Sequence, residues 1–499
     1  MIKTLRFNIK IAPIGILCFC LLFSYKSTAQ KLASVFKSID QEVSQNSLAY
    51  KTLGESCQTI GHRLTGSANG AKAENFAFQL LNQYGFKKNV KFHPFEAESW
   101  ARESVSLSIA PRKSDNFQDF NVVSLALTPV SSDIQGSMVD VGNGLEPDFE
   151  AKKELLKGKI ALINLGLLAP IKGPRNLHRS EKTALAIQYG AIGAIFVNTV
   201  KGEVLLTGTA SVTGAVISIP AVCISLESGT KLRDWISKEP ELLAFIKMKN
   251  FSGPTNARNV IATIPGTDKT LKNEKIVIGG HLDSWDLATG ALDNGIGSFS
   301  ILDIARTFKK LGLQSKRTIE FVVFMGEEEG LLGSKAYLSD CIKDKSINKI
   351  KFMLNLDMAN NTNGFNTNGR SEMTDFFTKT GEIIKTINPT FKNNIINQAT
   401  LHSDHQSYMM EGIPTAEPLG DIGEYAIGCY HANCDKFDLI KKEEMQNTVR
   451  YNAMMLYALA NASKINAPKL NSDQTKAFFI KQNLRKELEL GKAWRWGND

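Results

Sequence analysis

The sequence predicts an α/β protein, built on a mostly parallel mixed sheet that is covered by helices on both faces. Three observations support this fold class. Short apolar strands alternate with helical segments from residue 276 onward, which is typical of a buried parallel sheet. A smaller strand-helix-strand segment interrupts the chain within residues 120–252. With 499 residues, 43% of them hydrophobic and 22% charged, the chain is long enough for two folded units.

The first 29 residues have the pattern of a secretory signal peptide. Lys3, Arg6 and Lys10 precede an apolar run over 11–23, and the small residues after this run suit cleavage after Ala29. No later segment of about 20 residues stays apolar, so we expect no membrane span after cleavage. The mature protein should be exported, to the periplasm, the cell surface or the medium.

Charge and cysteine content limit the function further. The signal segment holds four basic residues and no acids, so the formal net charge falls from +9 to +5 in the mature chain. Lys and Arg form no dense cluster with aromatic residues, so nucleic-acid binding is not expected. Five cysteines remain, which is too few for a disulfide scaffold. Cys429 and Cys434 flank His431 and form either a disulfide or two small buried thiols.

Residues 30–119 should form the first part of the larger unit. Helical spacing of apolar residues, a glycine-rich turn, a second helix and an alternating strand occupy 49–60, 61–67, 71–84 and 105–109. The insert, residues 120–252, should contain strand 158–164, helix 182–189, strand 190–198 and a further apolar segment, 219–222. No residue of the insert indicates chemistry, so we assign it as a lid or recognition element.

Residues 253–465 should form the main sheet and its helices. The predicted strands are 276–280, 318–325 and 352–356, and the predicted helices are 296–308 and 334–340. Apolar residues of 296–308 gather on one helical face, which should pack on the sheet. Residues 466–499 should form a helical tail, with one charged helix over 472–490.

Histidine and acidic side chains follow the predicted strands of this main region. The candidates are His281, Asp293, Glu327, Glu328, Asp357, and His431 after the segment 427–430. Because the carboxyl ends of parallel strands meet at one edge of a sheet, we expect these side chains to lie together. Singly, each has an ordinary structural role such as helix capping, but the combined set indicates function. Their nitrogen and oxygen ligands suit zinc, so we predict a hydrolytic metal site.

The pattern resembles the co-catalytic zinc peptidases of the exported aminopeptidase and glutamate carboxypeptidase superfamily, and within it the carboxypeptidase Q family. The matching segments are 279–286, 290–293, 327–328, 356–357, 403–405, 412–414, and His431 with Asp435. The similarity extends through the insert to 63–67. The insert itself is similar to the protease-associated domain that interrupts some exported peptidases. The resemblance implies the zinc exopeptidase fold and metallopeptidase activity.

The same resemblance implies a role for each candidate. Asp293 would bridge two zinc ions per chain, and Glu327 would be the general base. The remaining ligands would be His281 and Asp357 for one ion, and Glu328 and His431 for the other. Asp283 would assist catalysis by orienting the imidazole of His281.

Two neighbouring segments leave alternatives open. Asp435 would either orient His431 or cap a turn. Asp404 and His405 would either act near the metals or have structural polar roles.

This chain departs from the family pattern at one position and is ambiguous at another. Relatives commonly have a second acid after the bridging aspartate, where this chain has Asn294. The run of three acids at 327–329 permits a register error of one residue, although Gly326 and Gly330 on either side favour the first two as base and ligand.

We therefore expect an exported dinuclear zinc exopeptidase that cleaves small peptides or dipeptides, and the resemblance implies a homodimer. Glu327 would take a proton from the attacking water and pass it to the leaving amine. Two alternatives remain: a glutaminyl cyclase-like transferase with a single zinc, and a non-catalytic receptor or binding protein on the same fold. The sequence leaves open which end of the peptide is anchored.

Overall fold

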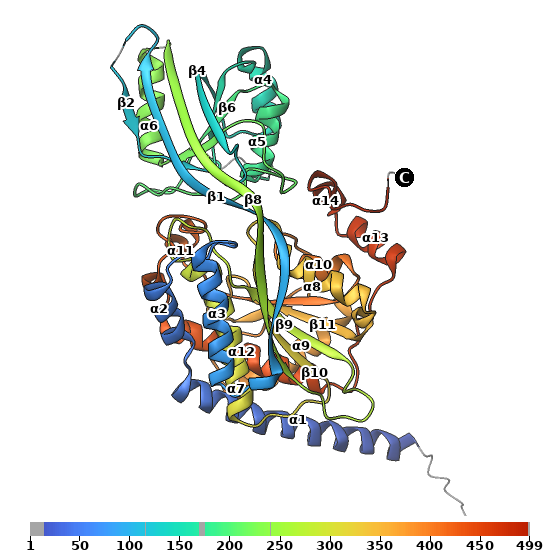
Figure 1. Cartoon of the computed structure of the whole chain (residues 1–499). Coiled ribbons are helices and arrows are strands. Elements are labelled where there is room, and N and C mark those ends of the chain that lie inside the picture. Colours follow the sequence, from blue (N-terminus) through green and yellow to red (C-terminus); the bar gives the residue numbers. More distant parts are fainter. Residues whose placement is uncertain (1–13, 115, 169–174, 240, 498–499) are drawn as a thin grey trace, which may run out of the picture.

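The computed structural model describes residues 14–114, 116–168, 175–239 and 241–497 and shows two units, one above the other (Figure 1). Two long strands, β1 (Val90–Pro111) and β8 (Leu242–Ile264), run from one unit into the other. They pair antiparallel along their length, with a bulge between Arg102 and Ser104. We call residues 103–249 the upper unit, and the rest of the chain the lower unit.

The lower unit is built on a mixed sheet whose central strands are parallel. β9 (Lys275–His281) pairs in parallel with β10 (Thr318–Phe324) and with β11 (Ile350–Asn355), which are the three strands predicted for this region. β8 pairs antiparallel with β10 on one side. On the other side the sheet continues from β11 through β14 (Thr415–Leu419), β12 (Gly364–Asn366) and β13 (Asn394–Ile396). The predicted fold class is confirmed.

Successive residues of the central strands face opposite layers of helices. Ile276 and Ile278 of β9 lie in the larger core, whereas Val277 between them packs with Tyr337 and Tyr408 on the other face. The first layer consists of α1 (Ile14–Asn46), α2 (Ala49–Thr59), α3 (Ala68–Gln83), α7 (Ile296–Lys310), α9 (Thr374–Ile387) and α12 (Lys442–Asn461). The second layer consists of α8 (Leu332–Lys343) and α10 (His405–Met410).

Helix α7 lies at the centre of the first layer, directly after the segment that carries Asp293. Every side chain from Ile296 to Phe308 is buried, not only those on the apolar face that the sequence predicts. The reason is that α2, α3 and α12 pack on the side that faces away from the sheet. A fully buried helix gives the preceding loop a rigid support.

The upper unit has its own smaller sheet and two small cores. Its parallel strands are β4 (Ser131–Gly142), β5 (Ile160–Asn164), β6 (Gly193–Val197) and β7 (Ala221–Ile224). The remaining elements are β2 (Gln118–Phe120), β3 (Val123–Ser124), α4 (Glu146–Leu156), α5 (Arg179–Gln188) and α6 (Leu226–Lys238). Ile160 and Leu162 enter one core, and Ala161 and Ile163 the other, so β5 is buried on both faces.

The N-terminal segment lies only partly within the described residues. Residues 1–13 of the predicted signal peptide lie outside the described residues, and α1 continues past the predicted cleavage position. Phe36, Ile39 and Val43 of α1 are fully buried in the lower core. Among the described residues, no helix combines the length and apolar character needed to span a membrane.

The single helix predicted over 472–490 is wrong. The tail forms two helices, α13 (Ser472–Lys481) and α14 (Arg485–Leu490). Between them Asn483 takes a left-handed conformation with φ of 59°, which ends the first helix. Asn is one of the few residues other than glycine that adopts this conformation readily.

Candidate metal centre

The strand ends of the lower unit bring three candidates together. His281 is the last residue of β9, and Asp357 follows β11. Nε2 of His281 lies 3.2 Å from Oδ1 of Asp293 and 3.3 Å from Oδ1 of Asp357. His281 and Asp293 are buried, whereas the Asp357 side chain is 22% exposed. This group therefore has one side open to a ligand.

His431 meets the same aspartate from the opposite side. Its Nε2 lies 2.8 Å from Oδ2 of Asp293 and 3.0 Å from Oε2 of Glu328. Asp293 thus turns one carboxylate oxygen toward each histidine. We call His281 with Asp357 the first half of the centre and His431 with Glu328 the second half, and Asp293 lies between the halves.

These side chains fit a bound metal. His281, Asp293 and Glu328 offer ligand atoms that lie within 4.8 Å of one another. Oε1 of Glu328 is buried without a hydrogen-bond partner. Two ligand atoms about 2.1 Å from a tetrahedral zinc ion are about 3.4 Å apart, close to the contacts between the histidines and carboxylates here. The mixed nitrogen and oxygen donors suit zinc.

The electrostatics of the centre also favour a cation. Burial and then neighbouring carboxylates raise the pKa of Glu327 and of Glu328 well above the ordinary glutamate value. Burial also disfavours the charge of Asp293, but the neighbouring imidazoles of His281 and His431 hold its pKa below the ordinary value. Several acids share a buried volume in which like charges repel strongly. A bound divalent cation would offset this repulsion.

Asp283 contacts both the glutamate turn, which carries Glu327 and Glu328, and the imidazole of His281. Its carboxylate accepts hydrogen bonds from the backbone amides of Glu327 at 3.3 Å and Glu328 at 3.2 Å. Its carbonyl oxygen lies 3.1 Å from Nδ1 of His281, closer than its carboxylate at 3.6 Å. Asp283 therefore lies beside the imidazole as predicted, but its backbone makes the closer contact.

The three successive glutamates have different surroundings. Glu328 contacts His431, whereas Glu329 is buried beside Thr65. Glu327 is the member of the run that is partly exposed. This arrangement agrees with the register in which Glu328 is a ligand and Glu327 is free to meet a substrate.

Asn294 has a structural role that an acid would not fill. Its side-chain amide donates to the carbonyl oxygens of Leu356 at 2.9 Å and His281 at 3.3 Å. Its Oδ1 accepts from the amides of Met358 at 3.0 Å and Gly297 at 3.2 Å. A carboxylate has no proton to donate to the two carbonyls. Asn294 thus joins the ends of β9 and β11 to the start of α7.

Two residues from distant segments hold the loop that carries Asp293. Asp435 accepts hydrogen bonds from the amides of Leu292 at 2.7 Å and Asp293 at 3.0 Å, so it caps the distant loop of Asp293. Burial raises the pKa of Asp435 to about 7. The fully buried guanidinium of Arg63 donates to the carbonyls of Thr289 at 2.7 Å and Gly290 at 2.8 Å.

The surroundings of His431 differ from the prediction. The segment before it is a short helix, α11 (Glu424–Gly428), not a strand, and His431 itself has a left-handed φ of 56°. A disulfide joins Cys429 and Cys434 across this loop, which decides between the two alternatives for these cysteines. The local chain thus turns sharply, so no strand end positions this histidine.

The upper unit supplies the contacts that hold His431. The backbone amide of Thr207 donates to the carbonyl oxygen of His431 at 2.9 Å. The backbone amide of Asn433 donates to the carbonyl oxygen of Leu205 at 3.0 Å. Nη2 of Arg179 lies 2.8 Å from Nδ1 of His431. The insert, in which no residue of the sequence indicates chemistry, thus places Thr207 and Arg179 in contact with His431. No motif marks these residues, because they reach the site only through the packing of the two units.

Asp404 and His405 separate in the structure. His405 contacts the carbonyl of Thr400 at 3.1 Å and Nδ2 of Asn355 at 3.3 Å, which is a structural polar role. Asp404 is fully buried, and neither carboxylate oxygen has a hydrogen-bond partner. Burial raises its pKa to about 7, and its charge acts on Glu327. The charge of Asp404 therefore interacts with His281 and Asp357, the first half of the centre.

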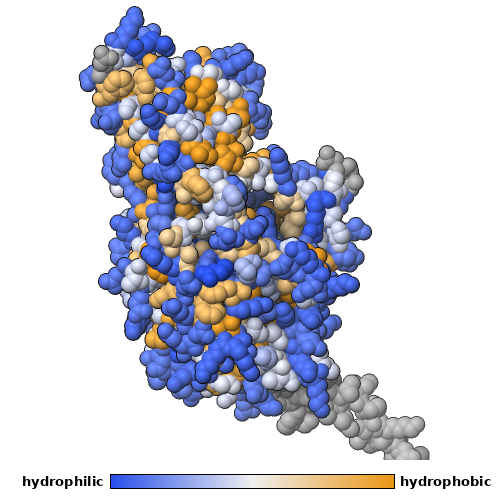
Figure 2. Space-filling view, in the orientation of Figure 1, coloured by the Kyte–Doolittle hydropathy of each residue, from blue (hydrophilic) through white to orange (hydrophobic). Residues whose placement is uncertain are grey.

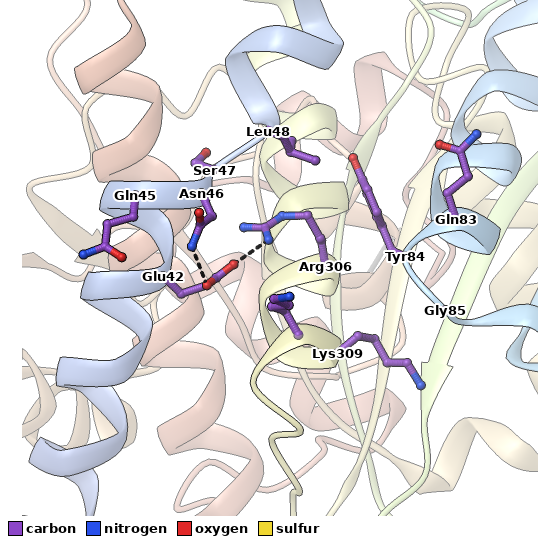
Figure 3. Close-up of a pocket in the computed structure, with 11 residues that line it drawn as sticks. Glu42, Gln45, Asn46, Ser47, Leu48, Gln83, Tyr84, Gly85, Arg306 and Lys309 are labelled. Carbon is purple, nitrogen blue, oxygen red and sulfur yellow. Dashed lines mark hydrogen bonds and ion pairs between the residues drawn. The ribbon is translucent and has the colours of Figure 1, made fainter.

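Cavities differ in size and in their relation to the metal centre. Figure 2 shows the surface hollowed where the two units meet. At the metal centre, Trp285, Asp293, Glu328 and His431 line a cavity of about 10 Å³, large enough for about one water. A much larger pocket of about 720 Å³ lies between α1, α3 and α7 (Figure 3), where Arg306 pairs with Glu42. It contains none of the candidate residues.

Comparison with protein families identifies the lower unit. The family model of peptidase family M28 matches residues 259–456, and that of the PA domain matches residues 128–232. Residues 259–456 thus form a domain of peptidase family M28. The chain is a metallopeptidase with a PA domain in its upper unit, as the resemblance predicts, and the two alternative functions are not favoured.

Individual relatives are similar to this chain over most of its length. It is 26% identical over 407 residues to carboxypeptidase Q of Xenopus laevis, which covers 81% of this chain and 83% of that protein. It is 31% identical over 315 residues to aminopeptidase YwaD of Bacillus subtilis, or 62% of this chain and 61% of that one. The crystal structure of a peptidase M28 precursor from Shewanella amazonensis shares the fold, with a TM-score of 0.74 and 23% identity over 89% of this chain and all of that one.

Proposed function

We propose that this M28 peptidase is an exported zinc exopeptidase that holds two zinc ions per chain and hydrolyses small peptides or dipeptides. The observation that carries the proposal is Asp293, whose two carboxylate oxygens face His281 at 3.2 Å and His431 at 2.8 Å. A carboxylate shared by two histidines on opposite sides is the arrangement that a pair of close metal ions needs. Each half also contributes an acid of its own.

The residues divide into ligands and a base. Asp293 would hold both ions, and the ligands of the two halves are His281 with Asp357, and His431 with Glu328. Bound zinc supplies Lewis-acid polarisation of the peptide carbonyl and activation of water. Glu327, which is partly exposed, takes the proton of the attacking water and passes it to the nitrogen of the leaving amine. Asp283 holds the glutamate turn in position through two backbone amides.

Export is supported by the N-terminal pattern and by the cysteines. Residues 1–29 have the basic, apolar and small-residue order of a signal peptide. The Cys429–Cys434 disulfide suits an oxidising compartment. The names of two relatives, a carboxypeptidase and an aminopeptidase, refer to opposite ends of a peptide, so we assign exopeptidase activity without choosing an end.

Metal counting and a panel of dipeptides test the proposal together. The purified mature chain should contain two zinc ions by elemental analysis and lose dipeptide cleavage when a chelator removes them. Peptides with a blocked amine and peptides with a blocked carboxyl should then differ, and the blocked end that abolishes cleavage is the end that is anchored. Full activity with one zinc ion per chain, or in the metal-free protein, would refute the proposed centre.

A further inference from the structure

Arg179 of the upper unit faces the side of the His431 ring that points away from Asp293. It is the first residue of α5, is 6% exposed, and places Nη2 2.8 Å from Nδ1 of His431. Gly208 leaves the room for this contact, because a Cβ at Gly208 would lie 1.8 Å from Nη2 and 2.5 Å from Nδ1. The Nε of Arg179 is buried without a hydrogen-bond partner. A charged group is thus held close to the centre with part of its hydrogen-bonding capacity unused.

The contact decides which nitrogen of His431 carries the proton of the neutral ring. A guanidinium has only donors, so Nδ1 must accept the hydrogen bond from Arg179. The neutral ring then carries its proton on Nε2, the nitrogen that lies 2.8 Å from Oδ2 of Asp293 and 3.0 Å from Oε2 of Glu328. A histidine that binds metal through Nε2 usually donates its other N–H to a carboxylate or carbonyl, the opposite arrangement.

The first half of the centre has the usual arrangement. Nδ1 of His281 faces the carbonyl oxygen of Asp283 at 3.1 Å, and a carbonyl can only accept. In the neutral ring, Nε2 of His281 is then the nitrogen without a proton, available to a metal. The two histidines therefore differ in the nitrogen that their neighbours leave free.

We propose that Arg179 competes with the second metal ion for His431, an inference that rests on the proposed dinuclear centre. A cation at Nε2 needs the lone pair of that atom, so the ring proton must move to Nδ1 and Arg179 must leave that nitrogen. The positive charge of Arg179 also opposes a second cation beside Asp293 and Glu328. The upper unit thereby sets how tightly the second half is loaded, whereas the first half is loaded independently of it.

Zinc affinities of an Arg179→Met chain test this proposal. The full mature chain is stripped of metal and titrated with zinc in competition with a chromophoric chelator. Loss of the competing charge should tighten the second zinc by about tenfold or more and leave the first unchanged. Arg233→Met is the matched control, because Arg233 is an arginine of the same unit that pairs with Asp140 rather than with a residue of the centre. It should leave the second zinc affinity unchanged.

A second variant protects the test against loss of folding. Arg179→Lys keeps the charge but replaces the planar fork with one ammonium group, so it should tighten the second zinc by less than Arg179→Met. Circular dichroism shows whether the Arg179→Met chain is folded. If it is folded and binds the second zinc no more tightly than the wild type does, the proposed competition is wrong. The proposed function has a separate readout, which is the number of zinc ions in the wild-type chain at saturation. Two ions with unchanged affinity in the variant reject only the role of Arg179.

Discussion

The first half of the metal centre is built from the ends of parallel strands in the lower unit, whereas the second half depends on a loop that the upper unit holds. His281 and Asp357 follow β9 and β11, and Asn294 joins these strand ends through hydrogen bonds to the backbone. His431 follows a short helix, and Thr207 and Arg179 of the upper unit contact it. One half is therefore fixed by the sheet and the other by the contact between units.

This difference indicates how the two halves should respond to change. Strand ends in a packed sheet move little, because their positions are set by many hydrogen bonds and by close packing. A loop held by an interface between units responds to whatever shifts that interface. We expect the first half to tolerate disturbance of the upper unit and the second half to report it.

The largest effect should come from Glu327, which serves both halves. Glu327→Gln removes the base but keeps the size of the side chain, so kcat should fall by about 10²-fold or more while both zinc ions remain. Steady-state kinetics on a dipeptide, with zinc counted in the same sample, measures this. Glu329→Gln is the matched control, because Glu329 is buried beside Thr65, and its activity should stay within a few-fold of wild type. The reverse result would shift the base by two residues.

A smaller loss should follow from Asp435→Asn, which loosens the carboxylate shared by the halves. An asparagine offers one acceptor oxygen where Asp435 receives two amides, from Leu292 and Asp293. Misplacement of Asp293 should lower kcat by about tenfold and weaken both zinc ions, since loss of a group that orients ligands typically costs about 10- to 100-fold. Zinc titration decides the matter. Weakening of one ion alone would show that Asp293 does not serve both.

Strand ends were predictable from the sequence, and interface contacts were not. The apolar runs 276–280, 318–325 and 352–356 form β9, β10 and β11, so His281, Glu327, Glu328 and Asp357 could be placed by counting along the chain. Arg179 lies 252 residues from His431 and belongs to no motif. Its contribution arises only when α5 packs against the lower unit. The sequence left two alternative roles for Asp435, and only the structure shows from which backbone amides it accepts hydrogen bonds.

The stability of the metal-free chain should depend on pH through the buried acids Asp404 and Asp435. Burial raises the pKa of Asp404 and of Asp435 from 3.8 to about 7. Between these values the folded chain binds protons that the unfolded chain does not, so stability falls as the pH rises from about 4 to 7. The metal-free Tm should be higher at pH 5.5 than at pH 8, by at least about 2 °C.

Differential scanning calorimetry of the chelated protein at the two pH values measures this difference. Asp404→Asn should reduce the dependence, because the amide does not titrate. A Tm that instead increases between pH 5.5 and pH 8 would contradict the assigned direction.

The smallest effect should come from the disulfide, which touches the second half alone. Replacing both Cys429 and Cys434 with serine opens a loop of only a few residues, so little chain entropy is involved. The second zinc should weaken by about two- to fivefold, within the range of effects that orient a ligand from outside. The first zinc should be unchanged, and a chelator competition resolves the two. Equal weakening of both ions would break the distinction between the halves.

The paired strands β1 and β8 have a consequence for how this protein is divided. Residues 104–111 of β1 hydrogen-bond with 242–249 of β8, so the predicted insert boundaries at 120 and 252 cut across a continuous ladder. A shortened chain without 120–252 would leave this end of β1 unpaired, with Leu107 and Ile109, both buried in the whole chain, beside an open edge. Open apolar edges recruit other chains and aggregate. The upper unit should therefore be exchanged between relatives only together with both strands, cut on the lower side of the bulge at Arg102.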